Sequence, residues 1–270
     1  MTDRETLDMP NDDPYLRGKH AIVTGGSRGI GAAIAAELAR AGADLTILAR
    51  STARLDQQAE RLRALGAQVT ALECDIAEEA SVRACFARAR DERGDAYVLV
   101  NNAGMAEAAP FGATSRELWD RTLAVNLTGV FTCTQQVLPA MLRARAGRVV
   151  NVASTAGLRG YKTMSAYCAS KHGVVGLTRA LAAETAKHGV TVNAVCPGYV
   201  ATDMTEHAVS NVVRALGKSE EDARAMIVGT VPRGSLITPE EVASAVLWLC
   251  RPEAGAVSGV ALPIAGGEMP

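Results

Sequence analysis

Apolar side chains gather along this chain in short runs that contain few polar positions. Seven of these runs are rich in β-branched residues, and they cover 20–24, 44–49, 68–73, 96–101, 148–153, 191–196 and 259–265. Because most runs are nearly continuously apolar rather than alternating, they suit strands that are buried on both faces, as in a parallel sheet. Pro263 lies inside the last run and cannot donate a ladder hydrogen bond, which predicts an edge strand or a bulge there.

The segments between these runs have the composition of helices. The stretch 31–42, for example, is rich in alanine and leucine, and Gly42 suits a C-terminal cap. Strands that alternate with helices predict βαβ units with right-handed crossovers. No linker, repeat or low-complexity tract interrupts the pattern. We therefore predict an α/β fold with one doubly wound sheet of seven parallel strands in a single domain, residues 18–270.

One long connection breaks this alternation, between Pro197 and Thr238. An excursion of that length in a compact domain is usually a functional lid. Ser219 suits the N-cap of a short helix within it, and apolar residues recur every four positions at Met204, Ala208, Val212 and Leu216. We predict a lid of two helices over 203–237 at the carboxyl ends of the strands, where open α/β sheets bind ligands. The alternative is a structural insertion.

Composition and charge narrow the function classes. The chain has 270 residues, of which 48% are hydrophobic and 21% charged, and a formal net charge of −1. These values are ordinary for a soluble globular protein and point to no nucleic-acid or membrane partner. The acidic, polar start predicts a flexible extension over 1–17 rather than a signal peptide. Six scattered cysteines and four histidines lack metal-ligand spacing, so we expect reduced thiols, no metal site and a cytoplasmic protein.

A glycine-rich segment follows the first predicted strand directly. It reads Thr-Gly-Gly-Ser-Arg-Gly-Ile-Gly over residues 24–31 and precedes a predicted helix. Gly25, Gly29 and Gly31 permit a tight turn, close approach of the backbone to a pyrophosphate and close helix–strand packing. The start of the helix then offers free N–H groups and a positive dipole end to phosphates. Because no Gly-Lys-Ser/Thr follows, the segment indicates a dinucleotide site rather than a P-loop.

The end of the second predicted strand discriminates between the two nicotinamide dinucleotides. An acidic side chain there would bind the ribose diol of NAD, whereas this chain has Arg50 followed by Ser51. Together with Arg28, two guanidinium groups are available to flank a 2′-phosphate, and each charge-assisted hydrogen bond contributes about 1.5–3 kcal/mol. We predict NADP(H) as the cofactor. The alternative is that both arginines are merely solvated.

A tyrosine and a lysine four residues apart form a candidate proton donor. Tyr167 and Lys171 lie in a stretch that reads as helix, so they share a face. A unit charge about 4 Å from the phenol contributes roughly 4 kcal/mol at an effective dielectric near 20, which is about 3 pKa units. We therefore expect Lys171 to lower the pKa of Tyr167 towards neutrality. Ser154, just past the fifth run, is placed to hydrogen-bond the same substrate oxygen. The alternative is an ordinary buried tyrosine beside a solvated lysine.

These motifs together resemble those of the short-chain dehydrogenase/reductase family of the single-domain type, over residues 18–270. The resemblance implies a Rossmann fold and four catalytic residues: Asn126, Ser154, Tyr167 and Lys171. It further implies that the cofactor is bound by Gly25, Ser27, Arg28, Gly29, Ile30, Gly31, Arg50, Ser51, Asp75, Ile76, Asn102, Ala103, Gly104, Tyr167, Lys171, Pro197, Gly198, Val200 and Thr202.

The resemblance also implies a role for each of these groups. Ser154 polarises a carbonyl, Tyr167 supplies the proton, and Lys171 binds the nicotinamide ribose. Asn126 holds a water that links Lys171 to solvent. The adenine amino group contacts Asp75, the adenosine ribose contacts 102–104, and the nicotinamide carboxamide contacts Val200 and Thr202. The expected activity is hydride transfer between nicotinamide and a ketone or secondary alcohol. Relatives commonly form homotetramers by pairing two long helices, here near 117–145 and 166–188.

The substrate is less well specified. The segments 153–181 and 196–204 are more similar to 3-oxoacyl thioester reductases and aromatic polyketide ketoreductases than to sugar or steroid enzymes. A 3-oxoacyl thioester on CoA or a carrier protein, or a related ketone, is therefore the expected small-molecule substrate. Ala183 and Ser235 replace residues that are often basic in relatives, which favours CoA or a free ketone. Tyr161 and Met164 are expected to shape the pocket. The alternatives are a dehydrogenase of non-acyl alcohols and a catalytically silent NADP(H)-binding sensor or scaffold.

Overall fold

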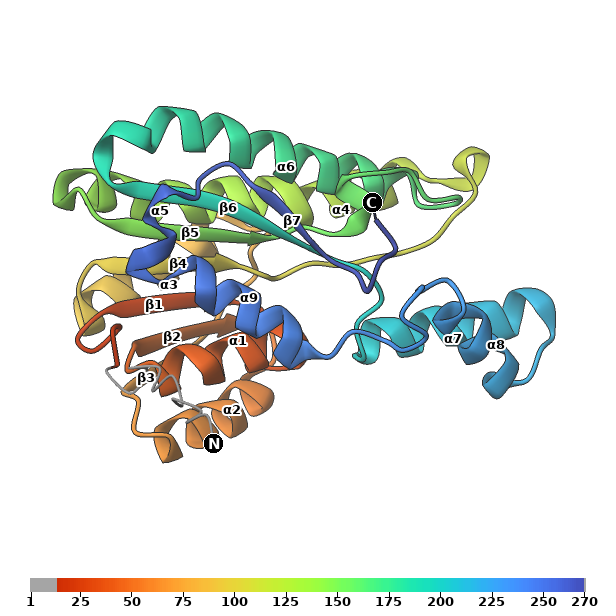
Figure 1. Cartoon of the computed structure of the whole chain (residues 1–270), viewed down its shortest axis with the longest axis horizontal. Helices are drawn as coiled ribbons and strands as arrows, with labels where there is room; N and C mark the ends of the chain where they lie inside the picture. The colour runs from red at the N-terminus through yellow and green to blue at the C-terminus, as the bar shows by residue number, and fades with distance from the viewer. Residues whose placement is uncertain (1–13, 270) are drawn as a thin grey trace, which may run out of the picture.

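The computed structural model describes residues 14–269, and in this range it contains a twisted sheet of seven parallel strands (Figure 1). The strand order is β3-β2-β1-β4-β5-β6-β7. The strands are β1 (His20–Thr24), β2 (Asp44–Ala49), β3 (Val69–Glu73), β4 (Ala96–Asn101), β5 (Gly147–Val152), β6 (Val190–Pro197) and β7 (Ala261–Ile264). Each strand overlaps one of the predicted apolar runs, so the predicted doubly wound Rossmann-type α/β sheet is confirmed.

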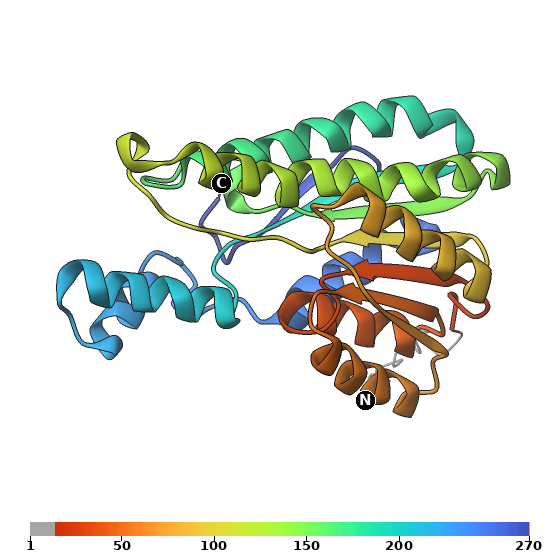
Figure 2. The ribbon, with the colours of Figure 1, turned by 180° about the vertical axis from the view of Figure 1, so that it is seen from behind.

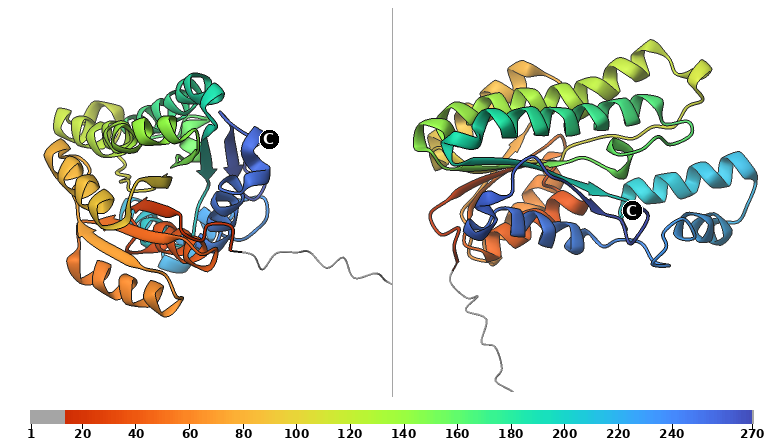
Figure 3. Two further views of the ribbon diagram at one scale, coloured as in Figure 1. Left: turned by 90° about the vertical axis from the view of Figure 1, so that its left-hand side faces the viewer. Right: turned by 45° about the horizontal axis from the view of Figure 1, so that its top comes forward.

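Helices cover both faces of the sheet. One face carries α1 (Gly29–Arg40), α2 (Thr52–Ala64) and α9 (Pro239–Leu249), and the other carries α3 (Glu79–Arg93), α4 (Arg116–Leu123), α5 (Gly129–Ala144) and α6 (Ser165–Thr185). Figure 2 shows α5 running alongside α6, and the end-on view in Figure 3 shows the sheet between its helical layers. Every residue of β5 and β6 is buried, as expected for strands that are covered on both faces.

The last strand lies at an edge of the sheet, as one of the two predictions for Pro263 required. The carbonyl oxygens of Val260 and Ile264 accept hydrogen bonds from the N–H groups of Ala194 and Gly198, at 2.8 and 3.1 Å. Because successive residues of a strand turn their backbone polar groups to opposite sides, the backbone of Pro263 faces away from β6. Its missing N–H therefore removes no hydrogen bond from the sheet.

The folded domain begins before residue 18. Leu16 is fully buried, and its N–H donates to the carbonyl oxygen of Ala41 at 3.0 Å. The hydroxyl of Tyr15 donates to the carbonyl oxygen of Leu247 at 3.1 Å. The predicted extension over 1–17 is therefore wrong for Tyr15 and Leu16, because these apolar side chains complete the core between α1 and α9. The part of that prediction over residues 1–13 lies outside the described residues.

The long connection after β6 forms two helices, α7 (Asp203–Leu216) and α8 (Glu220–Val228), which project beyond the carboxyl edge of the sheet (Figure 1). The side chain of Ser219 accepts a hydrogen bond from the N–H of Asp222 at 3.1 Å, which is the predicted N-cap. The two helices bury Val209 and Ile227 between them. Met204, at one end of the predicted apolar stripe, is 44% exposed. That these helices act as a lid stays a prediction.

Across residues 14–269, no helix combines the length and the apolar character that crossing a bilayer requires. In the same range, the structure contains no group of three or more His, Cys, Asp or Glu side chains that could hold a metal ion.

Candidate active site

The segment between β1 and α1 forms a tight turn at the carboxyl edge of the sheet, where the strand order reverses between β1 and β4. Open α/β sheets bind ligands at such a point. Gly25 has a φ of +64°, in the left-handed region that favours glycine. A Cβ on Gly31 would lie 2.2 Å from the Gly25 carbonyl oxygen, so α1 can begin this close to the turn only with glycine there. No side chain caps the first turn of α1, and its N–H groups therefore suit a pyrophosphate.

The residues after β4 fasten the glycine turn to the centre of the sheet. Asn102 Nδ2 donates to the carbonyl oxygens of Thr24 and Gly25 at 3.0 and 3.1 Å. The N–H groups of Asn102 and Ala103 donate to Thr24 Oγ1 at 3.0 and 3.1 Å. Asn102 therefore joins the end of β4 to the glycine turn. Sequence reasoning did not single out Thr24, although a hydroxyl at the end of a buried strand is a usable signal.

The two arginines predicted to bind a 2′-phosphate have different surroundings. The glycine turn runs beside the end of β2, because the N–H of Gly26 donates to the carbonyl oxygen of Leu48 at 3.2 Å. Arg50, two residues further on, is exposed. Arg28 forms an ion pair with Asp203 at the start of α7. Because both side chains of the pair are more than half exposed, it contributes about 0–1 kcal/mol, which leaves Arg28 able to exchange this partner for a phosphate.

Ser154 lies in the turn that follows β5. Its Oγ accepts a hydrogen bond from the N–H of Ala156 at 3.1 Å, at the start of a short 3₁₀ helix, η3 (Thr155–Gly157). Because Oγ accepts this hydrogen bond, the hydroxyl proton can be donated to the Tyr167 hydroxyl or to a substrate oxygen. A Cβ on Gly157 would lie 2.7 Å from the carbonyl oxygen of Lys171, so this turn packs directly on the backbone of α6. Close backbone packing thus brings Ser154 to the part of α6 that carries Lys171.

Lys171 is buried rather than solvated. Its side chain is 5% exposed, and Nζ donates to the carbonyl oxygen of Val152 at 2.9 Å. Nζ also lies 5.7 Å from the centroid of the Tyr167 ring, which confirms that the two side chains share a face of α6. The alternative of a solvated lysine is excluded. Burial lowers the pKa of Lys171 to about 8, because the charged form loses its hydration.

The electrostatics of Tyr167 differ from the expectation. Desolvation raises the pKa of Tyr167 to about 12, and its contact with Ser154 offsets this only in part. The expectation that Lys171 lowers this pKa towards neutrality is therefore wrong for this structure. That expectation took the Lys171 ammonium to be fully charged, whereas burial disfavours the charged forms of both Lys171 and Tyr167. The phenol keeps its proton at neutral pH and is set up as an acid.

Asn126 lies in a π-helical turn, η2 (Ala124–Thr128), between α4 and α5. Its side chain is fully buried: Oδ1 accepts from the N–H of Met105 at 2.9 Å, and Nδ2 donates to Ser170 Oγ at 3.1 Å. A Cβ on Gly104 would lie 3.3 Å from Asn126 Oδ1 and 3.6 Å from Lys171 Nζ, so both side chains face the same small space. A π-turn often marks a functional position. Neither Ser170 nor this turn has a recognisable signal in the sequence.

The other predicted cofactor residues lie in or next to the segments that follow β1, β2, β3, β4 and β6. Asp75 caps its own turn, because its Oδ1 accepts from the N–H of Ala77 at 3.0 Å. The Thr202 methyl carbon would lie 3.3 Å from a Cβ on Gly29, so Thr202 borders the glycine turn. Contact with a cofactor stays a prediction for every residue named for it, including these two and Ser27, Ile30, Ser51, Ile76, Ala103, Gly104, Pro197, Gly198 and Val200.

The buried amine of Lys171 leads to a prediction about stability. The folded protein releases this proton near pH 8, whereas the unfolded chain holds it until about pH 10.4. Between these values the unfolded chain binds more protons, so Lys171 destabilises the folded state below pH 8 and this effect fades as the pH rises. Relative to Lys171→Met, the wild-type free energy of unfolding should therefore increase by about 2 kcal/mol between pH 7 and pH 9.5.

Urea unfolding of both proteins at several pH values measures this difference. Comparing the two proteins cancels most of the pH effects of other groups. Lys187→Met, at an exposed position, is the matched control. A difference between wild type and Lys171→Met that stays constant over the pH range would show that Lys171 does not titrate in this way.

Comparisons with known proteins agree with this geometry. The family model described as short chain dehydrogenase matches residues 19–212. A curated protein of Streptomyces violaceoruber that carries the name of a granaticin polyketide synthase ketoacyl reductase is 43% identical over 249 residues, which cover 92% of each chain. A 3-oxoacyl-acyl-carrier-protein reductase of Vibrio harveyi is 38% identical over 252 residues, which cover 93% of this chain and 98% of the relative.

A solved structure gives the same result. An actinorhodin polyketide ketoreductase variant, crystallised with NADPH, superimposes with a TM-score of 0.90 and is 40% identical. The match covers 93% of this chain and 97% of the other. The similarity therefore extends over nearly the whole of both chains, the glycine turn and the segments that carry Ser154 and Tyr167 included.

Proposed function

The chain belongs to the short-chain dehydrogenase family, whose members are oxidoreductases, and we propose that it is an NADP(H)-dependent ketoreductase. The observation that carries the proposal is the arrangement of Ser154, Tyr167 and Lys171 at the carboxyl edge of the sheet. There, backbone packing places the Ser154 turn on α6, and Lys171 lies beneath the ring of Tyr167. These residues supply a hydroxyl donor, a protonated phenol and a buried amine at one place.

The glycine turn and the Asn102 contacts fit a dinucleotide, because the first turn of α1 is uncapped and a Cβ would collide with the turn at Gly31. When bound, the nicotinamide supplies the hydride. Ser154 donates its hydroxyl proton as a hydrogen bond to the substrate carbonyl and polarises it. Tyr167 gives up its proton to the forming alkoxide. Lys171 binds the nicotinamide ribose and passes a proton on towards the Tyr167 phenolate, and Asn126 holds the water through which solvent then reprotonates Lys171.

The high pKa of the Tyr167 phenol favours one direction of this reaction. Because the phenol is protonated at neutral pH, it serves as an acid in ketone reduction without any prior step. Alcohol oxidation requires the phenolate.

The choice of NADP(H) over NAD(H) rests on Arg50 and Arg28, and the solved relative that contains NADPH supports it. Arg50→Ala should weaken NADPH binding by about 10- to 100-fold, because one charge-assisted hydrogen bond contributes about 1.5–3 kcal/mol. The affinity for NADH, which has no 2′-phosphate, should change by less than about threefold. Fluorescence titration of both cofactors measures the effect. If the affinities for NADPH and NADH fell by the same factor, Arg50 would not bind the 2′-phosphate.

For the substrate, we propose a 3-oxoacyl thioester or a related ketone, as the names of the polyketide and 3-oxoacyl relatives suggest. The test follows NADPH oxidation by absorbance with acetoacetyl-CoA, longer 3-oxoacyl-CoAs, the same acyl groups on a carrier protein, and small ketones. The proposal expects the thioesters to give the highest kcat/KM. Turnover of simple ketones alone would restrict the function to a non-acyl reductase. NADPH binding without turnover of any compound would favour the silent sensor.

Assembly and location are proposals as well. Phe131 on α5 is 47% exposed, and covering it in a homotetramer built on α5 and α6 would bury this apolar surface. Light scattering of the purified protein gives the number of subunits directly. All six cysteines are free, which supports a reducing compartment such as the cytoplasm.

A further inference from the structure

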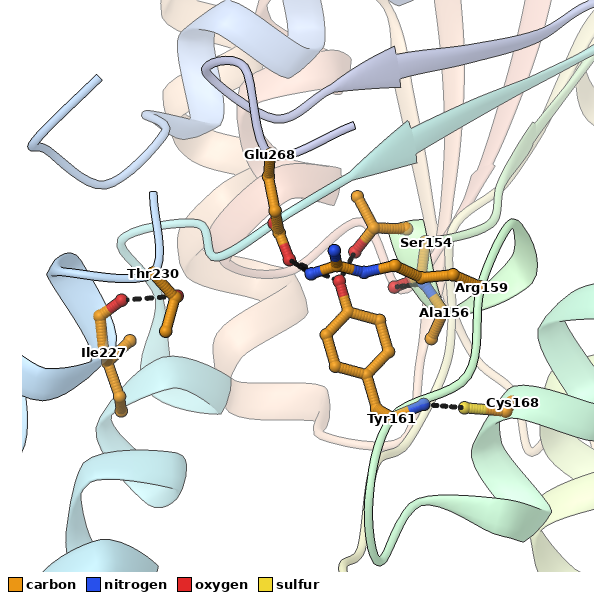
Figure 4. A network of polar contacts seen from close by, with 9 residues as sticks. Ser154, Ala156, Arg159, Tyr161, Cys168, Ile227, Thr230 and Glu268 are labelled. Carbon is orange, nitrogen blue, oxygen red and sulfur yellow. Dashed lines mark hydrogen bonds and ion pairs between the residues drawn. The ribbon is translucent and has the colours of Figure 1, made fainter. Parts of the chain in front are cut away.

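The turn that follows β7 holds a buried carboxylate that the chemistry above does not use. Gly266 and Gly267 adopt φ values of +57° and +90°, so the chain reverses direction after β7. The side chain of Glu268 then points back into the protein, where only 3% of it is exposed. It faces the segment that follows Ser154 (Figure 4).

One oxygen of Glu268 binds two side chains of that segment. Oε1 accepts from Arg159 Nη2 at 2.5 Å and from the hydroxyl of Tyr161. The same hydroxyl lies 2.7 Å from Thr155 Oγ1. Because a phenol has a single proton, Tyr161 donates to the carboxylate and accepts from Thr155. The Arg159 guanidinium also stacks 4.7 Å from the centroid of the Tyr161 ring, which holds the two side chains together.

The other oxygen of Glu268 lacks the hydrogen bonds that would make the carboxylate a purely stabilising group. Oε2 is buried and has no hydrogen-bond partner among the described residues. It is packed against the end of β6, since a Cβ on Gly198 would lie 2.7 Å from it. A buried acceptor without a partner destabilises the fold. The backbone is also strained two residues beyond Tyr161, because Thr163 has a φ of +65°, which β-branched residues rarely adopt.

The contacts of Glu268 lead directly to Ser154. The carbonyl oxygen of Thr155 accepts from the N–H of Arg159 at 3.1 Å, so residues 155–159 form one compact turn. The N–H of Ala156 in this turn fixes Ser154 Oγ at 3.1 Å. Any movement of Tyr161 or Arg159 is thus transmitted to the residues that orient the serine hydroxyl.

We infer that Glu268 is a positioning residue for Ser154: its carboxylate holds the turn 155–161, and so keeps the serine hydroxyl oriented towards the substrate carbonyl. The inference rests on the proposed ketoreductase function. Loss of the carboxylate should lower kcat by about 10- to 100-fold, because small errors in the position of a reacting group have effects of this size. Because Glu268 also packs against Gly198, a predicted cofactor contact, kcat is measured at saturating NADPH, where a change in cofactor affinity has no effect on it.

A double-mutant cycle with Ser154 tests the inference. Glu268→Ala should lower kcat as stated in the wild-type background and by less than about twofold in the Ser154→Ala background, because it acts through that hydroxyl. Equal losses in the two backgrounds would show that Glu268 only supports the fold. A wild-type protein that reduces no ketone would overturn the proposed function, and this inference with it.

Two further variants keep the test decisive if Glu268→Ala does not fold. Tyr161→Phe breaks the path from Thr155 to the carboxylate but leaves the ion pair with Arg159, and it should also lose kcat only when Ser154 is present. Glu268→Gln retains an oxygen for Tyr161 and should recover most of the kcat. A fully active Tyr161→Phe would overturn the inference. Glu253→Gln, which changes an exposed carboxylate, is the matched control.

Discussion

Tyr167→Phe should lower kcat by about a thousandfold, which corresponds to about 4 kcal/mol of additional barrier. The substitution removes only the hydroxyl that donates the proton to the forming alkoxide. Because the pKa of Tyr167 is raised to about 12, this hydroxyl carries its proton at neutral pH in the wild-type protein. A nearby water would replace it poorly as an acid. Steady-state assays of NADPH oxidation at saturating substrate measure the loss of kcat.

The ring of Tyr167 stays in place in this variant, so NADPH should bind with nearly its wild-type affinity. A fluorescence titration therefore separates loss of chemistry from loss of the cofactor. Ser154→Ala is the useful companion, since it removes the polarising hydrogen bond and leaves the acid. A Tyr167→Phe enzyme that retains more than about a tenth of the wild-type kcat would exclude Tyr167 as the proton donor.

Gly31→Ala should weaken both the fold and the binding of NADPH. The added Cβ would lie 2.2 Å from the carbonyl oxygen of Gly25 and 2.4 Å from Asn102 Nδ2. Neither is the end of a flexible side chain, because the first is backbone and the second is held by Thr24 and Gly25. The start of α1 must then move away from the glycine turn. Overpacking of this kind destabilises by about 2 kcal/mol, or roughly 4–8 °C in Tm.

The same movement displaces the N–H groups that suit the pyrophosphate, so we expect the dissociation constant of NADPH to rise by at least about tenfold. Thermal unfolding and cofactor titration measure the two effects. Gly112→Ala is the matched control, since a Cβ there meets no atom within 4 Å and the position is exposed. Wild-type melting and binding for Gly31→Ala would mean that the close contact at this turn is not required.

The sequence predicts the fold well because its signals are local. A buried parallel strand is a short β-branched run wherever it occurs, so the strand bounds agree closely with the runs. Pro263 predicts an edge or a bulge for a similarly local reason, its missing N–H, and the structure has the edge. The boundary at residue 17 fails because the burial of Leu16 depends on α1 and α9, which are distant along the chain. Local polarity could not show that contact.

The sequence predicts some features of the candidate site and misses others. Tyr167 and Lys171 share a helical face by simple periodicity, and the structure confirms this. The direction of the Tyr167 pKa shift was not predictable, because it depends on burial by residues from several elements rather than on one charge. Glu268 gave no local signal, since an acidic residue after a pair of glycines usually means an exposed turn. Its contact with Tyr161 joins residues 107 positions apart.

The backbone of Pro263, which faces away from β6, also affects whether molecules of this protein associate with one another in solution. An exposed sheet edge is a template on which another molecule can lay a strand, and such growth leads to aggregates. At β7 the approaching strand would find no donor opposite one of its carbonyl groups. The proline therefore protects this border of the sheet against self-association through the backbone, at no expense to the hydrogen bonds with β6.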